Sequence, residues 1–119
     1  MRRILDHAKR PRHWGSLPLP DFEAHDHNGV CGDVLTVQLK VQDNRIADVA
    51  FYGVSCSLTR TAASMTAERV IGVPIERAAT LDREFVLDVI GVPVAAPRMQ
   101  CALLHLKVLN TALRGPRSA

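Results

Sequence analysis

Three cysteines and one aspartate are the residues of this sequence best suited to chemistry. Each cysteine stands at the boundary of an expected element: Cys31 precedes a strand, Cys56 follows the next strand, and Cys101 opens a helix. Loop ends supported by rigid elements are where ligands and reactive groups are usually carried. A thiolate both attacks persulfides and binds metals, so this placement suits either sulfur chemistry or metal binding.

Asp33 adds a hard oxygen ligand to this set. It follows Cys31 by two residues, with only Gly32 between them. Three thiolates and one carboxylate are a donor set for tetrahedral zinc or for part of an iron-sulfur centre. An odd number of cysteines cannot close into a complete disulfide framework, which favours metal or reactive sulfur chemistry. The alternative is that scattered cysteines without C-x-x-C spacing fill gaps in the core as small hydrophobic residues.

Three histidines near the cysteines are further candidate ligands. His105 follows Cys101 by four residues, one helical turn along the same face, and so could approach the metal. Its alternative role is that of a partly buried ring that hydrogen-bonds within the packing. His25 and His27 flank Asp26 before the first cysteine and are either auxiliary ligands or solvated loop residues. The polar character of that segment favours the solvated role.

A predicted hairpin brings the first two cysteines toward each other. Residues 34–41 alternate apolar and polar side chains, which is typical of a half-buried strand. Residues 45–53 alternate likewise, and the Asp-Asn pair between the two segments tolerates the positive φ of a tight turn. Because a hairpin folds back, Cys31 and Cys56 are expected at the same end of the sheet.

Helices are predicted after the hairpin, where apolar residues recur at helical intervals. They cover residues 57–71, 81–90 and 101–113, and a short additional helix covers residues 1–10. Thr80 is the expected N-cap of the second helix, and residues 13–29 form a long connection with at most one short edge strand. Cys56 and Cys101 thus lie at helix N-termini, which lower a thiol pKa. Strands first and helices after indicate an α+β domain, with helices packed on one face of a small antiparallel sheet.

Composition limits the classes of function. A chain of 119 residues with 47% hydrophobic residues suits one domain over residues 1–119. A net charge of +3 and 4% aromatic residues argue against nucleic-acid binding. The sequence contains no apolar stretch long enough to predict a membrane span or a secretory signal, so we expect a cytoplasmic protein. The last helix lacks a strict heptad, which favours a monomer or a weak dimer.

Four segments resemble, in order, the U-type iron-sulfur cluster scaffolds (IscU, the N-terminal domain of NifU, and SufU). They are ILDHAKRPRHWGSL, NGVCGDVLTVQLKV, GVSCSLTRTAASM and CALLHLKVLNTAL, and together they extend over nearly the whole chain. The resemblance implies a SufE/NifU-like fold. It also implies that Cys31, Cys56 and Cys101 hold a transient [2Fe-2S] cluster or Zn²⁺, that Cys56 and Cys101 are persulfide acceptors, and that Asp33 ligates or tunes the site.

The same resemblance implies a scaffold rather than an enzyme. Members of the family receive sulfur from a cysteine desulfurase, build a [2Fe-2S] cluster and transfer it to apo iron-sulfur proteins. SufU-like members instead bind zinc and accept sulfur, and a structural zinc-binding interaction module is a third alternative. The interval between Cys56 and Cys101 suits the scaffold branch, whereas Gln100 replaces the histidine usual there and the CALL segment is similar to SufU. The sequence leaves the branch open.

Overall fold

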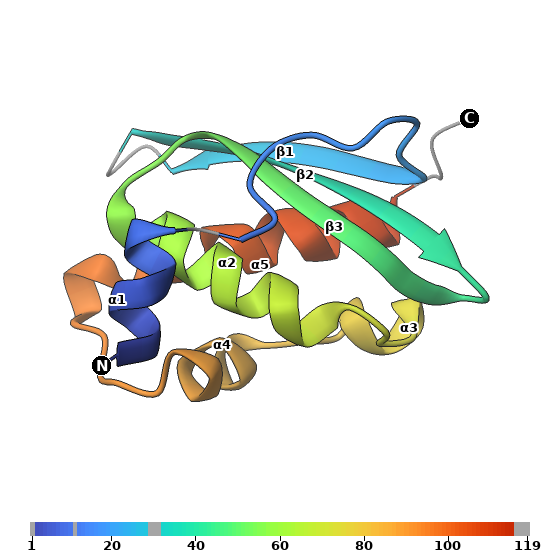
Figure 1. Ribbon diagram of the computed structural model, residues 1–119. Helices are drawn as coiled ribbons and strands as arrows, with labels where there is room; N and C mark the ends of the chain where they lie inside the picture. The colour runs from blue at the N-terminus through green and yellow to red at the C-terminus, as the bar shows by residue number, and fades with distance from the viewer. Residues whose placement is uncertain (1, 11, 29–31, 116–119) are drawn as a thin grey trace.

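The computed structural model describes residues 2–10, 12–28 and 32–115 and shows a three-stranded antiparallel sheet with helices on one face (Figure 1). The strands, in the order β1-β2-β3, are β1 (Phe22–Asn28), β2 (Asp33–Gln42) and β3 (Arg45–Val54). The helices are α1 (Arg2–Lys9), α2 (Ser57–Val70), α3 (Ile75–Ala78), α4 (Arg83–Ile90) and α5 (Met99–Arg114), and a 3-10 turn, η1 (Ala96–Arg98), precedes α5. The predicted α+β class is confirmed.

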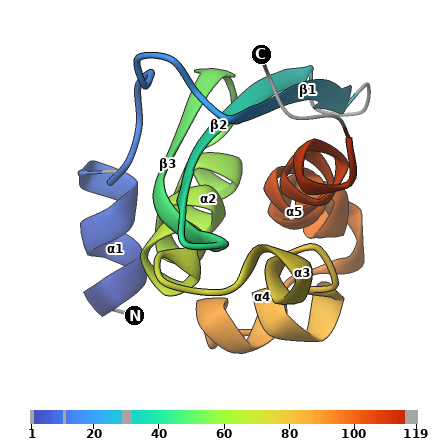
Figure 2. The same ribbon diagram turned by 90° about the vertical axis from the view of Figure 1, so that its right-hand side faces the viewer.

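Helices α2 and α5 form the layer directly beneath the sheet (Figure 2). α5 packs under β1 and β2, α2 packs against β3 and α5, α1 packs on α2, and α4 contacts both central helices. The core comes from the alternating strand positions that the sequence predicted, because Leu35, Val37, Leu39, Val49 and Phe51 are all fully buried. None of the helices in the described ranges is long and apolar enough to cross a bilayer.

The hairpin of β2 and β3 has the predicted turn. Asp43 and Asn44 adopt φ values of 54° and 62°, and Gln42 pairs with Arg45 across the turn. At the other end of the hairpin, Gly53 has a φ of 139°, and a Cβ built on it would lie 2.0 Å from the carbonyl oxygen of Val34. Only a residue without a side chain allows this approach of β3 to β2.

Strand β1 is more regular than the sequence predicted. It pairs with β2 along its whole length, from Phe22 opposite Leu39 to Asn28 opposite Asp33. Its sequence, FEAHDHN, carries little apolar character because β1 is an edge strand, and so the alternation signal is weak. The sequence favoured solvated loop positions for His25 and His27. Both residues lie instead on a paired strand.

The start of α4 corrects the predicted cap. Asp82, not Thr80, is the N-cap residue, and its Oδ1 accepts a hydrogen bond from the Phe85 N–H at 3.1 Å. The Thr80 hydroxyl donates instead to the Arg77 carbonyl oxygen at 2.9 Å, at the end of α3, a helix that the sequence pattern did not predict. α4 ends as predicted at Gly91, which has a φ of 75°.

Candidate metal centre

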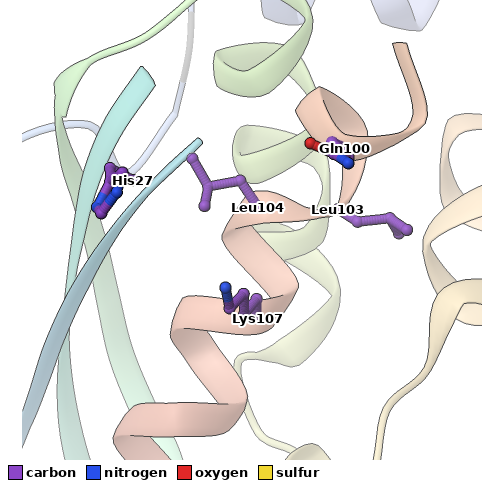
Figure 3. Close-up of a pocket in the computed structure, with 5 residues that line it drawn as sticks. All are labelled: His27, Gln100, Leu103, Leu104 and Lys107. Carbon is purple, nitrogen blue, oxygen red and sulfur yellow. The ribbon is translucent and has the colours of Figure 1, made fainter. Parts of the chain in front are cut away.

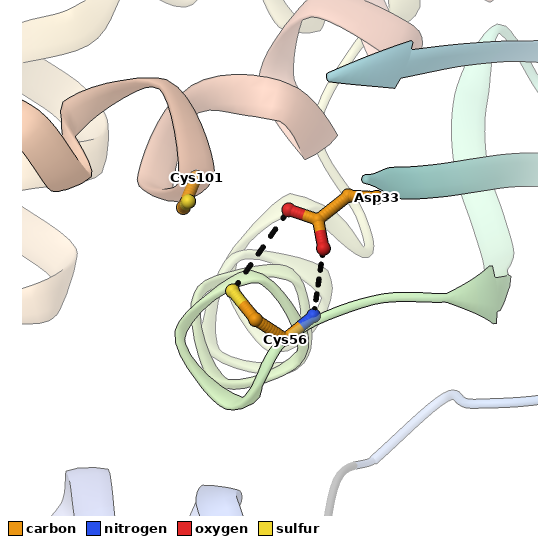
Figure 4. A group of neighbouring side chains, drawn as sticks. All are labelled: Asp33, Cys56 and Cys101. Atoms are coloured by element: carbon orange, nitrogen blue, oxygen red, sulfur yellow. Dashed lines mark hydrogen bonds between the residues drawn. The ribbon is translucent and has the colours of Figure 1, made fainter. Parts of the chain in front are cut away.

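Asp33, Cys56 and Cys101 converge at the end of the sheet where β2 begins and β3 ends (Figure 4). One carboxylate oxygen and the two sulfur atoms all lie within 4.8 Å of one another. Donor atoms on a tetrahedral zinc ion with bonds of about 2.0–2.3 Å lie about 3.3–3.8 Å apart, so small side-chain shifts would let these three atoms share one ion. Cys31, the third predicted cysteine ligand, lies outside the described residues.

The secondary structure explains why these three side chains meet. Asp33 is the first residue of β2, and the pairing of Val34 with Val54 puts it beside the end of β3. Cys56 is the N-cap residue of α2, two positions after β3. Cys101 lies in the first turn of α5, which packs along α2 and beneath β2. A hairpin end and two helix starts thus supply the donor set.

Asp33 is 2% exposed, and each of its two carboxylate oxygens accepts a hydrogen bond. Its Oδ1 accepts a hydrogen bond from the Cys56 N–H at 2.8 Å, and its Oδ2 accepts one from the Thr59 hydroxyl at 2.9 Å. Buried polar groups need such partners, and a helix N-terminus favours a negative charge. Asp33 therefore fixes the start of α2 and presents Oδ2 to the sulfur of Cys56, 3.8 Å away.

Thr59 is a site residue that the sequence reasoning missed. Its hydroxyl oxygen lies 3.3 Å from Cys56 Sγ, 2.9 Å from Asp33 Oδ2 and 3.0 Å from the Cys101 carbonyl oxygen. The side chain is completely buried. The position of Thr59 in the sequence does indicate this role, because a residue three positions after a helix N-cap, here Cys56, faces that cap.

The surroundings of Cys56 favour its thiolate form. Burial raises the pKa of this thiol, but hydrogen bonds with the side chain and backbone of Thr59 lower it. The negative charge of Asp33 raises the pKa, and a hydrogen bond with Cys101 lowers it. The net pKa lies below the ordinary value of a cysteine. The thiolate is the form that attacks sulfur and binds metal, as the helix-start argument predicted.

Arg98 adds a positive charge at the edge of the site. Its Nη2 lies 3.9 Å from Cys56 Sγ, and the side chain is exposed. Hydrogen bonds with Cys56 and Cys101 raise the pKa of Arg98, so the guanidinium stays charged. Since Arg98 ends the turn η1, directly before α5, the segment that positions Cys101 also brings this cation to the sulfur of Cys56.

The structure does not bring His105 into the donor set. The ring is completely buried, its Nε2 lies 2.7 Å from the hydroxyl oxygen of Thr66, and it packs edge-on against Phe51. Burial lowers the pKa of His105 to about 3, so the ring is neutral. The predicted alternative, a partly buried and hydrogen-bonded ring, therefore describes the role of His105, although the ring is more deeply buried than predicted.

Gln100 belongs to a different feature from Cys101, its neighbour in the chain. It lines an open hollow between α5 and the end of β1 (Figure 3). The other lining residues are His27, Leu103, Leu104 and Lys107. Successive helix residues point about 100° apart, which explains how adjacent residues serve a hollow and a metal centre separately.

The fold and the donor set together define a small α+β domain suited to thiolate chemistry. The chain belongs to the NifU-like N terminal domain family, whose model matches residues 1–115. It is 32% identical over 111 residues to the iron-sulfur cluster assembly scaffold protein IscU 1 of Archaeoglobus fulgidus, a match covering 93% of this chain and 72% of that protein. The family predicted from the sequence is confirmed.

The chain is also similar to a second curated relative and, in its fold, to a solved structure. Over 82 residues the chain is 32% identical to the zinc-dependent sulfurtransferase SufU of Bacillus subtilis, covering 69% of this chain and 55% of that protein. The crystal structure of a NifU-like N-terminal protein from Brucella abortus has the same fold, with a TM-score of 0.75 at 24% identity, covering 96% of this chain and 91% of that chain. The predicted NifU-like fold is therefore confirmed.

Proposed function

We propose that this protein is an iron-sulfur cluster assembly scaffold that accepts sulfur from a cysteine desulfurase and transfers a [2Fe-2S] cluster to apo iron-sulfur proteins. The observation that carries the proposal is the convergence of Asp33, Cys56 and Cys101 within 4.8 Å. The relationship to scaffold proteins named IscU supports it. The cluster is cargo in this role, so the site has to bind it and also release it.

The donor set suits temporary binding. Cys31, Cys56 and Cys101 would supply thiolates to the iron, and Asp33 would supply an oxygen. An oxygen ligand holds iron less firmly than a fourth thiolate, which keeps the cluster exchangeable. The hydroxyl of Thr59 lies within hydrogen-bond distance of the sulfur of Cys56 and of the carboxylate of Asp33, so it would keep both donors oriented.

Cys56 is the sulfur acceptor that the burial pattern favours. It is partly exposed, whereas Cys101 is completely buried. The Cys56 thiolate would attack the outer sulfur of a persulfide on the desulfurase. A new sulfur-sulfur bond forms on Cys56, the persulfide bond of the desulfurase breaks, and its cysteine leaves as a thiolate, so no external electrons are needed. The guanidinium of Arg98, 3.9 Å from Cys56 Sγ, would stabilise the anionic sulfur.

A zinc-dependent sulfur-transfer partner is the second candidate. The relationship to SufU of Bacillus subtilis favours it, and three thiolates with one carboxylate are a tetrahedral zinc set. In that role Zn²⁺ would hold Cys31, Asp33, Cys56 and Cys101 until one thiolate accepts sulfur. A structural zinc module, the third candidate, would unfold when the metal is removed. The apolar core around Phe51 and Leu109 supports a fold that persists without metal.

Metal and sulfide analysis separates the candidates. The protein is purified without oxygen and analysed before and after incubation with iron, cysteine and a desulfurase. Iron and labile sulfide in equal amounts, with visible absorption that Cys31→Ala and Cys56→Ala abolish, is the result expected of a scaffold. Tight stoichiometric zinc with no acquired cluster would replace the scaffold proposal with sulfur transfer. Unfolding on chelation of the metal, seen by circular dichroism, would instead favour the structural module.

A further inference from the structure

Two histidines of β1 share the face of the sheet that the helices leave uncovered. His25 and His27 are two residues apart on the strand, so their side chains leave it on the same side. Asp26, between them, points to the opposite side, where its Oδ2 lies 2.9 Å from the Nζ of Lys107 on α5. Both histidines are exposed. Their exposure leaves room for a ligand beside both side chains.

The spacing of the pair suits chelation of one ion. A rise of about 3.4 Å per residue puts the two Cα atoms about 7 Å apart, and imidazole rings at that separation can converge on a metal with bonds of about 2.0–2.1 Å. The backbone is held in place, because His25 pairs with Thr36 and His27 with Val34 on β2. Two imidazoles suit borderline divalent ions such as Zn²⁺, Ni²⁺ and Fe²⁺.

Asp26 holds the backbone beside His27 in place. Its Oδ1 lies 3.7 Å from Nδ1 of His27 and accepts a hydrogen bond from the backbone N–H of His27 at 2.8 Å. The His27 ring lines the hollow of Figure 3 beside α5, and binding one ion together with His25 requires it to turn away from Asp26. The side chain is 74% exposed, which leaves room for this rotation.

We propose that His25 and His27 bind a divalent transition-metal ion on the outer face of the sheet, with water completing its coordination. This site is separate from the donor set of Asp33, Cys56 and Cys101. His27 lies opposite Val34, which is 47% exposed, whereas the next residue, Asp33, is 2% exposed and turns to the helical face. The two sites thus lie at the same end of the sheet on opposite faces, and the outer one functions independently of any sulfur chemistry.

The test is a titration of the untagged protein with Ni²⁺, followed in amide NMR spectra with the metal added to several equivalents. Paramagnetic broadening is expected at residues 25–27 and at residues 34–36 across the ladder, in addition to any at the cysteines. In His25→Asn and in His27→Asn, the Ni²⁺ concentration for half-broadening at these residues should rise at least about tenfold. His13→Asn is the matched control and should change nothing there, since asparagine tolerates the φ of 59° at that position.

Two results would overturn the proposal. One is broadening confined to the cysteines or to His13, or absent altogether. The other is broadening at residues 25–27 that persists unchanged in both β1 variants. Since neither sulfur nor a desulfurase takes part, the outcome is independent of whether the protein proves to be a scaffold.

Discussion

Asp33 holds Cys56 by its backbone and faces its sulfur with the other carboxylate oxygen. Oδ1 accepts a hydrogen bond from the Cys56 N–H at 2.8 Å, and Oδ2 lies 3.8 Å from Cys56 Sγ. One side chain therefore anchors the start of α2 and offers a ligand atom. An ion bound to Oδ2 would leave the backbone hydrogen bond to Oδ1 intact, so in the proposed role metal would bind and leave without disturbing the helix.

Asp33→Ala should stabilise the bound cluster and destabilise the protein without it. Removing the oxygen ligand is expected to lengthen the lifetime of the cluster, measured as decay of its visible absorption. The Cys56 N–H loses its acceptor, whereas the Thr59 hydroxyl keeps the Cys101 carbonyl oxygen. The unpaired N–H should lower the free energy of unfolding by about 1–3 kcal/mol. Faster cluster loss from this variant would contradict the role given to Asp33.

Asp33→Asn is the matched variant that separates the two effects. Its amide oxygen can still accept from the Cys56 N–H, so the loss of stability should be smaller than in Asp33→Ala. The anionic ligand is absent from both variants, and both should therefore hold the cluster longer. Equal unfolding free energies for the two variants would show that the hydrogen bond at Oδ1 contributes little.

Thr59→Val should raise the pKa of the Cys56 thiol. Valine keeps the shape of the side chain but lacks the hydroxyl, and hydrogen bonding with Thr59 is what outweighs burial at Cys56. Alkylation of Cys56, followed by peptide mass spectrometry against pH, should reach half its maximum at a higher pH than in the parent protein. Thr61→Val is the control, because that hydroxyl donates to the Ser57 carbonyl oxygen and makes no contact with the site residues.

Arg98→Gln should slow sulfur acceptance, and Arg98→Lys should restore part of it. The guanidinium beside Cys56 favours the thiolate and the anionic persulfide through its charge, which lysine keeps and glutamine lacks. The measurement is the rate of persulfide formation on Cys56 with a desulfurase and cysteine. Arg83→Gln removes an exposed arginine of α4 and is the matched control. Rates that are equal in the parent protein and Arg98→Gln would rule out a role of this charge.

His105 should make the protein less stable in mild acid. The folded-state pKa of about 3 lies below the ordinary value of 6.5, so the unfolded chain binds the proton first as the pH falls. The stability from the neutral ring is complete above the unfolded pKa and is lost progressively between about pH 6.5 and pH 3. From pH 7.5 to 5.5 this group should remove about 1.4 kcal/mol from the free energy of unfolding.

Denaturant unfolding of the parent protein and His105→Gln at the two pH values measures this contribution. The variant keeps a polar group near Thr66 but does not titrate. Between pH 7.5 and pH 5.5 it should therefore lose about 1.4 kcal/mol less of its free energy of unfolding than the parent protein. Imidazole NMR signals of the parent protein should also show a neutral His105 ring at pH 5. A ring protonated at pH 5 in the folded protein would contradict the buried position.

Local patterns predicted the parts of the molecule that depend on neighbouring residues in the chain. The hairpin follows from strand alternation and from the turn residues Asp43 and Asn44. Cys56 stands at the start of a helix because the apolar period changes there. Thr80 and Asp82 are both good caps, however, and only the packing of α3, which takes the Thr80 hydroxyl, decides between them.

The contacts that complete the site come from tertiary packing and leave no such pattern. Thr59 acquires its role because α5 brings the Cys101 carbonyl oxygen to it, 42 residues further along the chain. The periodicity of α5 put His105 on the same face as Cys101, but the position of the helix against the core directs that ring to Thr66 instead. Edge-strand residues such as His25 have no apolar alternation to identify them.

The close approach at Gly53 has a consequence for how the chain tolerates mutation. Any side chain there would meet the Val34 carbonyl oxygen and force β3 away from β2. Asp33 and Cys56 belong to the two segments that would separate. A position with no functional group of its own thus controls whether the donors can share one ion. In a library of all single substitutions, position 53 should accept glycine alone, as strictly as the cysteines themselves.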